Sequence, residues 1–284
     1  MRRVEKLYEI LKSCELCPRK CRVDRTKGEK GICRSGLNPV ISSVGPHFGE
    51  EPELVGRHGS GTIFFTYCNL GCIYCQNYNI SHRGYGKEIT VEELAKQMLF
   101  LQEIYCHNIN LVTPTHFVPQ IVKAIEIAKR QGLKIPIVYN CGGYENVEVI
   151  KLLEGIVDIY MPDIKYSDDE IAGKYSNASD YFERAKESIK EMHRQVGDLQ
   201  VEDGIAVRGL IIRHLVLPDN LAGSQEILRF ISEEISKDTY VNIMDQYRPM
   251  FKASSYPELN RRITSLEFSK VVDLARRFGL YRGF

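Results

Sequence analysis

From about residue 60 onward, short apolar runs alternate with longer segments of helical periodicity. Runs of this length are typical of buried strands, and they cover residues 62–66, 110–113, 136–139, 156–160, 209–213 and 240–244. Six strand–helix units of roughly thirty residues each predict a parallel sheet. Two architectures satisfy this pattern, an open doubly wound sheet and a curved, incomplete barrel. Both bind ligands at the C-terminal ends of their strands, so the residues that follow each strand are the candidates for function.

The helical segments between these strands carry clear start signals. Thr90 with Glu93, and Thr264 with Glu267, each form a capping box ahead of an apolar stripe. These stripes are assigned to core packing and to no ligand. The polar stretch 196–207 is predicted to be a loop before the fifth strand.

The first sixty residues do not share this alternation. They contain four cysteines and many glycine, proline and charged residues. The sequence therefore predicts two parts, a small cysteine-rich metal module over residues 1–60 and an α/β domain over residues 61–284.

Charge and cysteine content narrow the function classes. The 38 basic and 37 acidic residues nearly cancel, which argues against a nucleic-acid partner. The N-terminus lacks a secretory signal, and no run approaches the ~20 apolar residues of a membrane span. Nine cysteines without an export signal point to a reducing compartment, where clustered cysteines bind metals more often than they form disulfides. A cytoplasmic protein without membrane attachment is expected.

Three cysteines follow the first predicted strand with the spacing C-x3-C-x2-C, namely Cys68, Cys72 and Cys75. Three thiolates on one short loop can hold three corners of a [4Fe–4S] cube and leave the fourth iron without a protein ligand. An open metal position is where a substrate can bind. The alternative is a structural zinc site with a remote fourth ligand such as His82, although zinc sites usually use two pairs of cysteines.

A second set of four cysteines lies in the N-terminal module, at Cys14, Cys17, Cys21 and Cys33. Four thiolates complete either a tetrahedral zinc site or a fully ligated iron–sulfur cluster. A segment this short has no core of its own, so a metal would be needed to fix it. Free cysteines without metal remain the third alternative.

The spacing of Cys68, Cys72 and Cys75, with Tyr74 before the last cysteine, resembles the signature of the radical S-adenosylmethionine (SAM) superfamily. Further matches over roughly residues 60–250 resemble the branch of pyruvate formate-lyase activating enzymes. The resemblance implies an incomplete (β/α)6 barrel that binds a [4Fe–4S] cluster and SAM. It also implies a reduced electron donor such as flavodoxin or ferredoxin. The loop that carries Cys68, Cys72 and Cys75 is called the radical loop below. In the activating enzymes extra clusters typically follow this loop in the sequence, so a second set of cysteines at the N-terminus departs from that pattern.

The resemblance assigns cofactor contacts at three strand ends. Asn140 and Cys141 follow the third strand, where the activating enzymes carry an Asp-Thr-Asn-Gly turn, and would lie near the methionine carboxylate. Asp163 and Lys165 resemble the Asp-x-Lys of the family. Arg213 resembles the fifth-strand arginine that faces the cofactor.

The remaining assignments concern the ribose and the methionine amino group. Gln246 follows the sixth strand, where the family places a polar residue near the ribose. The family usually has Gly-Gly-Glu after the second strand, but here the sequence is Thr-Pro-Thr-His over residues 113–116. Without that carboxylate, the amino group would depend on Thr113, Thr115 or backbone carbonyls, together with His116.

The leading hypothesis is an enzyme that cleaves SAM reductively to a 5′-deoxyadenosyl radical, which then abstracts a hydrogen atom. By resemblance, its target is a backbone glycine of a partner enzyme. Radical modification of RNA, a peptide or a small metabolite is the enzymatic alternative. A non-catalytic iron–sulfur electron carrier is the alternative from another class.

Overall fold

The computed structural model describes residues 2–284, and the six predicted strands all form. They are β2 (Ser60–Phe65), β4 (Ile109–Val112), β5 (Ile137–Cys141), β6 (Ile159–Pro162), β8 (Ile205–Leu215) and β9 (Tyr240–Met244). Each pairs in parallel with the next in chain order. Because this order never reverses, the sheet is not doubly wound and agrees with a partial parallel barrel.

Three further strands are antiparallel and were not predicted. They are β1 (Val40–His47), β3 (Lys87–Glu88) and β7 (Gln200–Glu202). β1 pairs with β2, with Val44 opposite Ile63, so residues 40–47 of the N-terminal part belong to the sheet. The division at residue 60 stays a prediction. The predicted loop over residues 196–207 is wrong, because β7 and β8 form a hairpin whose Asp203-Gly204 turn has positive φ at both residues.

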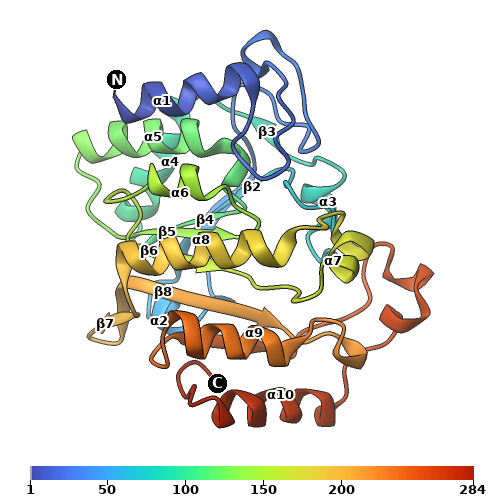
Figure 1. The fold of residues 1–284 in the computed structure, drawn as a ribbon. Helices are drawn as coiled ribbons and strands as arrows, with labels where there is room; N and C mark the ends of the chain where they lie inside the picture. The colour runs from blue at the N-terminus through green and yellow to red at the C-terminus, as the bar shows by residue number, and fades with distance from the viewer. Residues whose placement is uncertain (1) are drawn as a thin grey trace.

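Ten α-helices pack mainly around the sheet (Figure 1). They are α1 (Arg3–Ile10), α2 (Pro52–Val55), α3 (Tyr78–Ser81), α4 (Val91–Glu103), α5 (Val118–Arg130), α6 (Val147–Lys151), α7 (Asp169–Ser176), α8 (Tyr181–Val196), α9 (Ser224–Phe230) and α10 (Ser265–Arg277). Short 3₁₀ turns cover Leu11–Ser13, Arg25–Lys27, Thr115–Phe117, Pro218–Asn220, Ala253–Ser255 and Pro257–Leu259, and a π-helical turn covers Ile231–Ile235. The capping boxes predicted for α4 and α10 are confirmed.

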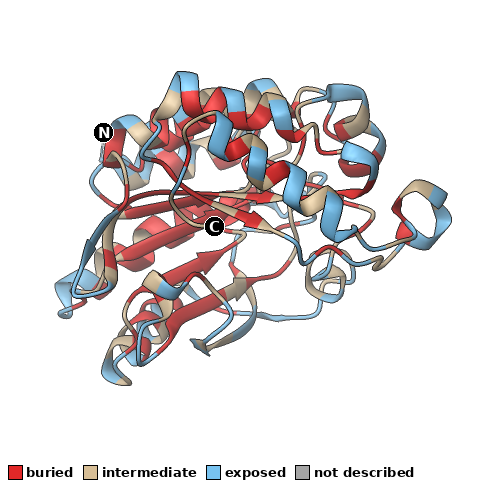
Figure 2. Ribbon diagram, turned by 90° about the horizontal axis from the view of Figure 1, so that it is seen from below, coloured by how far each residue is buried: buried red, intermediate tan, exposed pale blue. Residues whose placement is uncertain are grey.

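Alternate residues of the strands face two separate apolar clusters. The larger cluster lies between the sheet and the helices, whose outer faces are exposed while the strands are buried (Figure 2). The smaller cluster contains Val138, Ile159 and Ile211 together with Leu54 from α2. The segment 50–55 therefore packs against the strand residues that do not face the helices.

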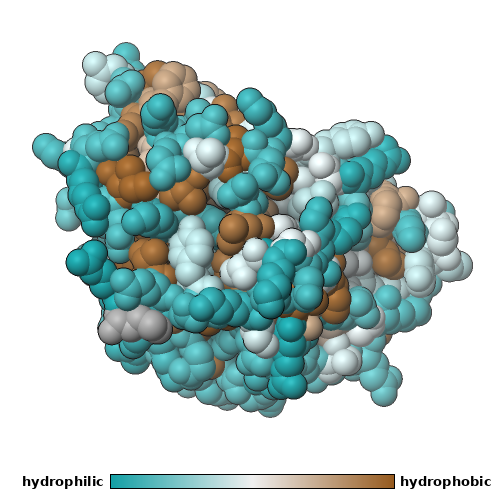
Figure 3. All heavy atoms as spheres, turned by 90° about the horizontal axis from the view of Figure 1, so that it is seen from above, coloured by the Kyte–Doolittle hydropathy of each residue, from teal (hydrophilic) through white to brown (hydrophobic). Residues whose placement is uncertain are grey.

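The N-terminal loop that carries the cysteines is held by backbone hydrogen bonds. Cys14 N–H donates to Val23 O at 3.0 Å, and Arg22 N–H donates to Cys14 O at 3.0 Å. Asn146 fastens this loop to the barrel by donating to Glu15 O at 2.7 Å. The face that carries α1 and α5 has mostly hydrophilic groups with apolar groups between them (Figure 3). Over residues 2–284, the helices are all too short or too polar to cross a bilayer.

Candidate active site

The C-terminal ends of the parallel strands surround a cavity of about 300 Å³. The loop after β2 contributes Cys72, Tyr74 and Cys75. The predicted cofactor residues that line the same cavity come from four other strand ends and are Asn140, Asp163, Lys165, Arg213 and Gln246. Residues from positions far apart in the sequence are thus brought together where parallel α/β folds bind ligands.

A network of opposite charges crosses this cavity. Arg213 Nε lies 3.0 Å from Asp163 Oδ1, and Lys165 Nζ lies 2.5 Å from Asp163 Oδ2. Arg213 also donates to Asn140 Oδ1 at 2.8 Å and lies 3.3 Å from Glu50 Oε2. Two cations face two carboxylates, so the paired charges offset the cost of partial burial.

The network fixes the ionisation of its members. Burial would raise the pKa of the Asp163 carboxyl, but Lys165 and Arg213 outweigh it and hold this pKa below its usual range. Burial raises the pKa of Glu50, and Arg213 opposes that shift only in part. The cavity therefore presents a firmly ionised Asp163 and a carboxyl at Glu50 that binds protons more readily than usual.

The loop that carries Cys68, Cys72 and Cys75 is anchored through its backbone and its sulfurs. Ile73 N–H donates to Tyr175 O at 2.9 Å, and Ser176 Oγ–H donates to Cys72 Sγ at 2.9 Å. Leu70 N–H lies 3.4 Å from Cys68 Sγ and donates to it. Burial raises the pKa of the Cys68 and Cys72 thiols.

Tyr74 is a buried packing residue of the loop as well as a lining residue of the cavity. Its hydroxyl accepts a hydrogen bond from Tyr166 at 2.6 Å, and its ring packs edge-on against Tyr247 at 5.8 Å between centroids. These contacts hold the third cysteine of the loop in place.

His82 is not directed at the sulfur atoms. Its Nε2 lies 3.0 Å from the carbonyl oxygen of Cys72, and its ring stacks on Phe251 at 4.4 Å between centroids. A carbonyl oxygen only accepts, so Nε2 is a donor and is not free to bind a metal. In the zinc alternative, His82 could therefore bind only through Nδ1.

Three predicted cofactor residues do not line the cavity. Thr115 is buried and donates to Glu145 Oε1 at 2.6 Å. Cys141 is buried, and Thr113 has a left-handed backbone whose N–H donates to Asn140 O. Their roles in cofactor binding stay predictions without support from the cavity.

Glu50 and His47 line the cavity but were missed in the sequence. His47 Nδ1 lies 3.4 Å from Glu50 Oε1, which joins these residues as a pair. His47 is the last residue of β1 and Glu50 follows this strand, which is antiparallel and has no apolar run. Only the pairing of β1 with β2 places them beside the parallel strand ends, so no local pattern could have identified them.

The N-terminal cysteines line a separate, small cavity. Cys14, Cys17, Cys21 and Cys33 surround it together with His116, which is 2% exposed. Burial lowers the pKa of His116 to about 3, so its ring is neutral. Over residues 2–284, no three His, Cys, Asp or Glu side chains converge on a single metal-ion position, and this holds for both cysteine sets.

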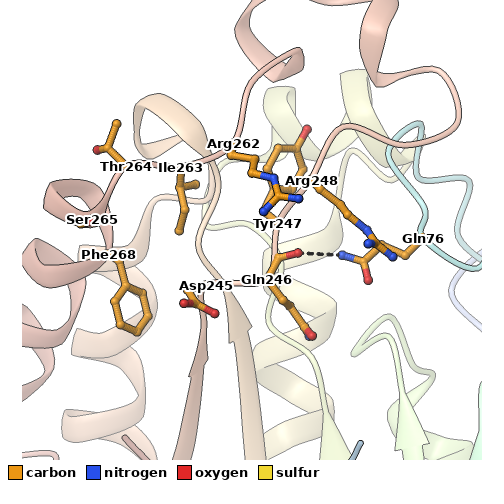
Figure 4. Close-up of a pocket in the computed structure, with 10 residues that line it drawn as sticks. All are labelled: Gln76, Asp245, Gln246, Tyr247, Arg248, Arg262, Ile263, Thr264, Ser265 and Phe268. Carbon is orange, nitrogen blue, oxygen red and sulfur yellow. Dashed lines mark hydrogen bonds between the residues drawn. The ribbon is translucent and has the colours of Figure 1, made fainter.

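A larger polar cavity of about 570 Å³ adjoins the first, and the two share Gln76 and Gln246. Gln76 donates to the carbonyl oxygen of Gln246 at 3.1 Å, across the border between them (Figure 4). Arg248, Arg262 and Asp245 line this outer cavity and bring two positive charges and one negative charge to it.

Sequence comparison decides the family. The sequence model of the radical SAM superfamily matches residues 62–208, from the strand before Cys68 into β8. The chain belongs to the radical SAM superfamily. Its relatives include the uncharacterized protein MJ0674 of Methanocaldococcus jannaschii, which is 35% identical over 98% of this chain and 78% of that protein. Pyruvate formate-lyase-activating enzyme of Clostridium pasteurianum is 30% identical over 66% of this chain and 75% of that protein.

Solved structures agree with the fold. HydG, a maturase of the [FeFe]-hydrogenase, has a TM-score of 0.53 at 15% identity over 76% of this chain. HydG from Carboxydothermus hydrogenoformans has a TM-score of 0.52 at 12% identity over 75% of this chain. The chain spans about half the length of both structures. At such low identity the likeness concerns the fold alone, an α/β fold with a mainly parallel sheet.

Membership of the radical SAM superfamily implies a [4Fe–4S] cluster, SAM and its reductive cleavage. The residues fit these groups, since three thiols share one loop beside a cavity with paired charges for a zwitterionic ligand. Soft thiolates suit iron–sulfur clusters, and donors to Cys68 and Cys72 would stabilise the thiolate form.

Proposed function

We propose that this radical SAM enzyme abstracts a hydrogen atom from a backbone glycine of a partner protein, in the manner of an activating enzyme. The observation that carries the proposal is the shared cavity of Cys72, Cys75, Asp163 and Arg213, together with the likeness to the pyruvate formate-lyase-activating enzyme of Clostridium pasteurianum. When bound, the cluster would supply one electron and SAM the adenosyl group, with the bond between sulfur and the 5′-carbon broken and methionine released. Hydrogen transfer from glycine would then give 5′-deoxyadenosine and a glycyl radical.

Within this proposal Cys68, Cys72 and Cys75 hold the cluster. Asn140, Asp163, Lys165 and Arg213 would hold SAM, since their polar atoms share the cavity and offer both signs of charge. Gln246 lines both cavities and would lie where the cofactor meets the substrate.

We also propose that Glu50 supplies the carboxylate that the sequence after β4 lacks. It lines the same cavity as Asn140 and Arg213, and its side chain is only 7% exposed. A carboxylate there would accept hydrogen bonds from the methionine amino group, a charge-assisted contact. This accounts for an amino-group site without Gly-Gly-Glu.

A reduced donor such as flavodoxin or ferredoxin would supply the electron, and the cytoplasm is the proposed location. The outer cavity with Arg248 and Arg262 would admit a loop of the protein substrate, and its positive charge favours acidic neighbours of the reacting residue. We further propose that the set Cys14, Cys17, Cys21 and Cys33 supplies thiolate ligands to a second metal, because all four line one small cavity.

The test is anaerobic reconstitution with iron and sulfide, followed by reduction and assay of 5′-deoxyadenosine. A candidate glycyl radical enzyme is then labelled with deuterium at the glycine α-carbon. Deuterium in 5′-deoxyadenosine would support the glycine target. Cleavage without deuterium transfer from protein would favour a peptide, RNA or small-metabolite substrate. A reducible cluster without any cleavage would favour the electron carrier.

A further inference from the structure

The N-terminal cavity is small and rich in metal-binding groups, and Arg19 and Arg25 also line it. Four thiols from residues 14–33 line it, and His116 reaches it from the loop after β4. Its free volume is about 10 Å³, close to that of a single water-sized probe. Such a space has room for one ion bonded directly to protein atoms.

His116 has one ring nitrogen without a partner. Its Nε2 lies 2.8 Å from the carbonyl oxygen of Thr66, and a carbonyl only accepts, so Nε2 carries the proton. The neutral ring therefore has its lone pair on Nδ1, which is buried and makes no hydrogen bond within the described chain. Buried polar atoms without partners are rare in native proteins, so this nitrogen calls for a ligand.

The backbone of the N-terminal loop passes close to the sulfur atom of Cys21. A Cβ at Gly31 would lie 2.7 Å from Cys21 Sγ, so glycine is required there. The next residue, Ile32, donates its N–H to Cys21 Sγ at 3.4 Å. Lys20 and Arg22, on either side of Cys21, both adopt left-handed backbone with φ of 41° and 56°. Such strained conformations persist where the surrounding structure fixes them, often at ligand sites.

We propose that His116 Nδ1 and three of the four N-terminal cysteines bind one zinc ion in a tetrahedral site. Zinc takes four nitrogen or sulfur ligands in closed structural sites, and neutral imidazole with thiolates is a common set. This deepens the second metal site proposed above and is independent of the radical chemistry. The donors surround the cavity without converging on one point, but each cysteine sulfur is positioned by a single torsion with three staggered states.

This zinc site would stabilise the backbone of the radical loop. His116 Nε2–H holds Thr66 O, two residues before Cys68. Arg19, between Cys17 and Cys21, donates to Asn69 O at 2.9 Å. A zinc ion would therefore fix two backbone positions of the cysteine loop that binds the cluster.

The test uses the full chain with the triple substitution Cys68→Ala, Cys72→Ala, Cys75→Ala, which cannot hold the radical cluster. We expect one zinc per chain by metal analysis, and X-ray absorption with three sulfur ligands and one nitrogen. Four sulfurs and no nitrogen would overturn the role of His116. Iron with acid-labile sulfide would overturn zinc, and a folded chain without metal would overturn the site.

Single substitutions in the otherwise native chain provide the second measurement. His116→Leu should lower zinc affinity at least about tenfold, the loss expected for one metal contact. His116→Cys should restore zinc with four sulfur ligands, and an unchanged nitrogen signal in that variant would contradict the proposal. His214→Asn is the matched control, because His214 is also buried but both of its ring nitrogens have partners. Because zinc is measured directly, absence of SAM cleavage in the native chain would leave this result unaffected.

Discussion

Two loops of this protein place three cysteines within eight residues, with the spacing reversed between them. Cys14, Cys17 and Cys21 are separated by two and then three residues, and the cysteines over residues 68–75 by three and then two. The second loop opens on a cavity of about 300 Å³, whereas the first encloses a free volume of about 10 Å³. Similar cysteine spacing therefore occurs beside cavities of very different size, and the residues around the sulfurs distinguish the two loops.

The charged groups around the two loops can also be compared. Lys165 and Arg213 line the cavity beside Cys72 and Cys75 and can neutralise an anionic centre. Arg19 and Arg25 line the N-terminal cavity. Burial raises the pKa of the Cys17 thiol, and Glu145 and two other cysteines add to this shift. A bound cation would favour the thiolate form there.

The largest effect should separate the two loops by substitution of cysteines in each. Cys72→Ser should lower 5′-deoxyadenosine production by about 1000-fold or more, because the cluster loses a ligand and the chemistry depends on it. Zinc content should stay at one per chain. Cys17→Ser combined with Cys21→Ser removes at least one of the three sulfur ligands, so it should lower zinc affinity and leave a reducible cluster. Equal loss of both metals in both variants would show that the loops act as one site.

Glu50 provides a test of the proposed SAM site beside the radical loop. Glu50→Gln should weaken SAM binding roughly tenfold, since a charge-assisted hydrogen bond contributes about 1.5–3 kcal/mol. Equilibrium binding to the reconstituted enzyme checks this, with iron content as the measure of the cluster. The matched control is Glu53→Gln, because Glu53 is bonded to Tyr240 without lining the cavity. Equal effects of both changes would remove Glu50 from the cofactor site.

Arg19 connects the two loops, and its removal should have a smaller effect. Arg19→Met deletes its hydrogen bonds to Asn69 O and Ser176 O. Loss of about 1–2 kcal/mol would lower Tm by roughly 2–8 °C for a chain of this size. Thermal unfolding and the rate of cluster loss are the measurements. A changed Tm with an unchanged rate of cluster loss would show that the loops are not coupled.

The smallest effect concerns how the free energy of unfolding depends on pH, through a buried carboxyl near the N-terminal cysteines. Burial raises the pKa of Glu145 to about 7, although Thr115 and Tyr139 donate to it and oppose the shift. The folded state then holds a proton that the unfolded state loses above about pH 4.3. This contribution to stability is complete below that pH and is lost as pH rises toward 7. Glu145→Gln should flatten the decline in a series of unfolding curves, and an unchanged slope would contradict the assignment.

Much of the parallel sheet could be predicted because its strands are local apolar runs. Residues 110–113 and 240–244 illustrate this, since each forms most or all of a strand at nearly the expected position. β1 could not be predicted, because its residues alternate little and contain glycine and proline. Its pairing with β2 is decided by contacts distant in sequence.

The residues of the site also fall into those that the sequence could predict and those that it could not. Asp163, Lys165 and Arg213 follow or end strands, so topology alone predicts that they gather. Glu50 and the partnerless nitrogen of His116 depend on loop paths that no periodicity describes. Thr115 follows its strand as expected but turns to Glu145, because a buried hydroxyl takes the nearest strong acceptor.

The long-range contacts of the segment 50–55 imply an order in which the parts of the fold form. Glu50, Glu51 and Glu53 contact Arg213, Asn242 and Tyr240 across sequence separations of 163, 191 and 187 residues. Contacts this distant form slowly, because a long chain must be closed before they can stabilise it. During synthesis Leu54 would lack its neighbours on β8 and β9 until nearly the whole barrel had emerged from the ribosome. The cavity that Glu50 and Arg213 both line should therefore be among the last parts of the molecule to mature.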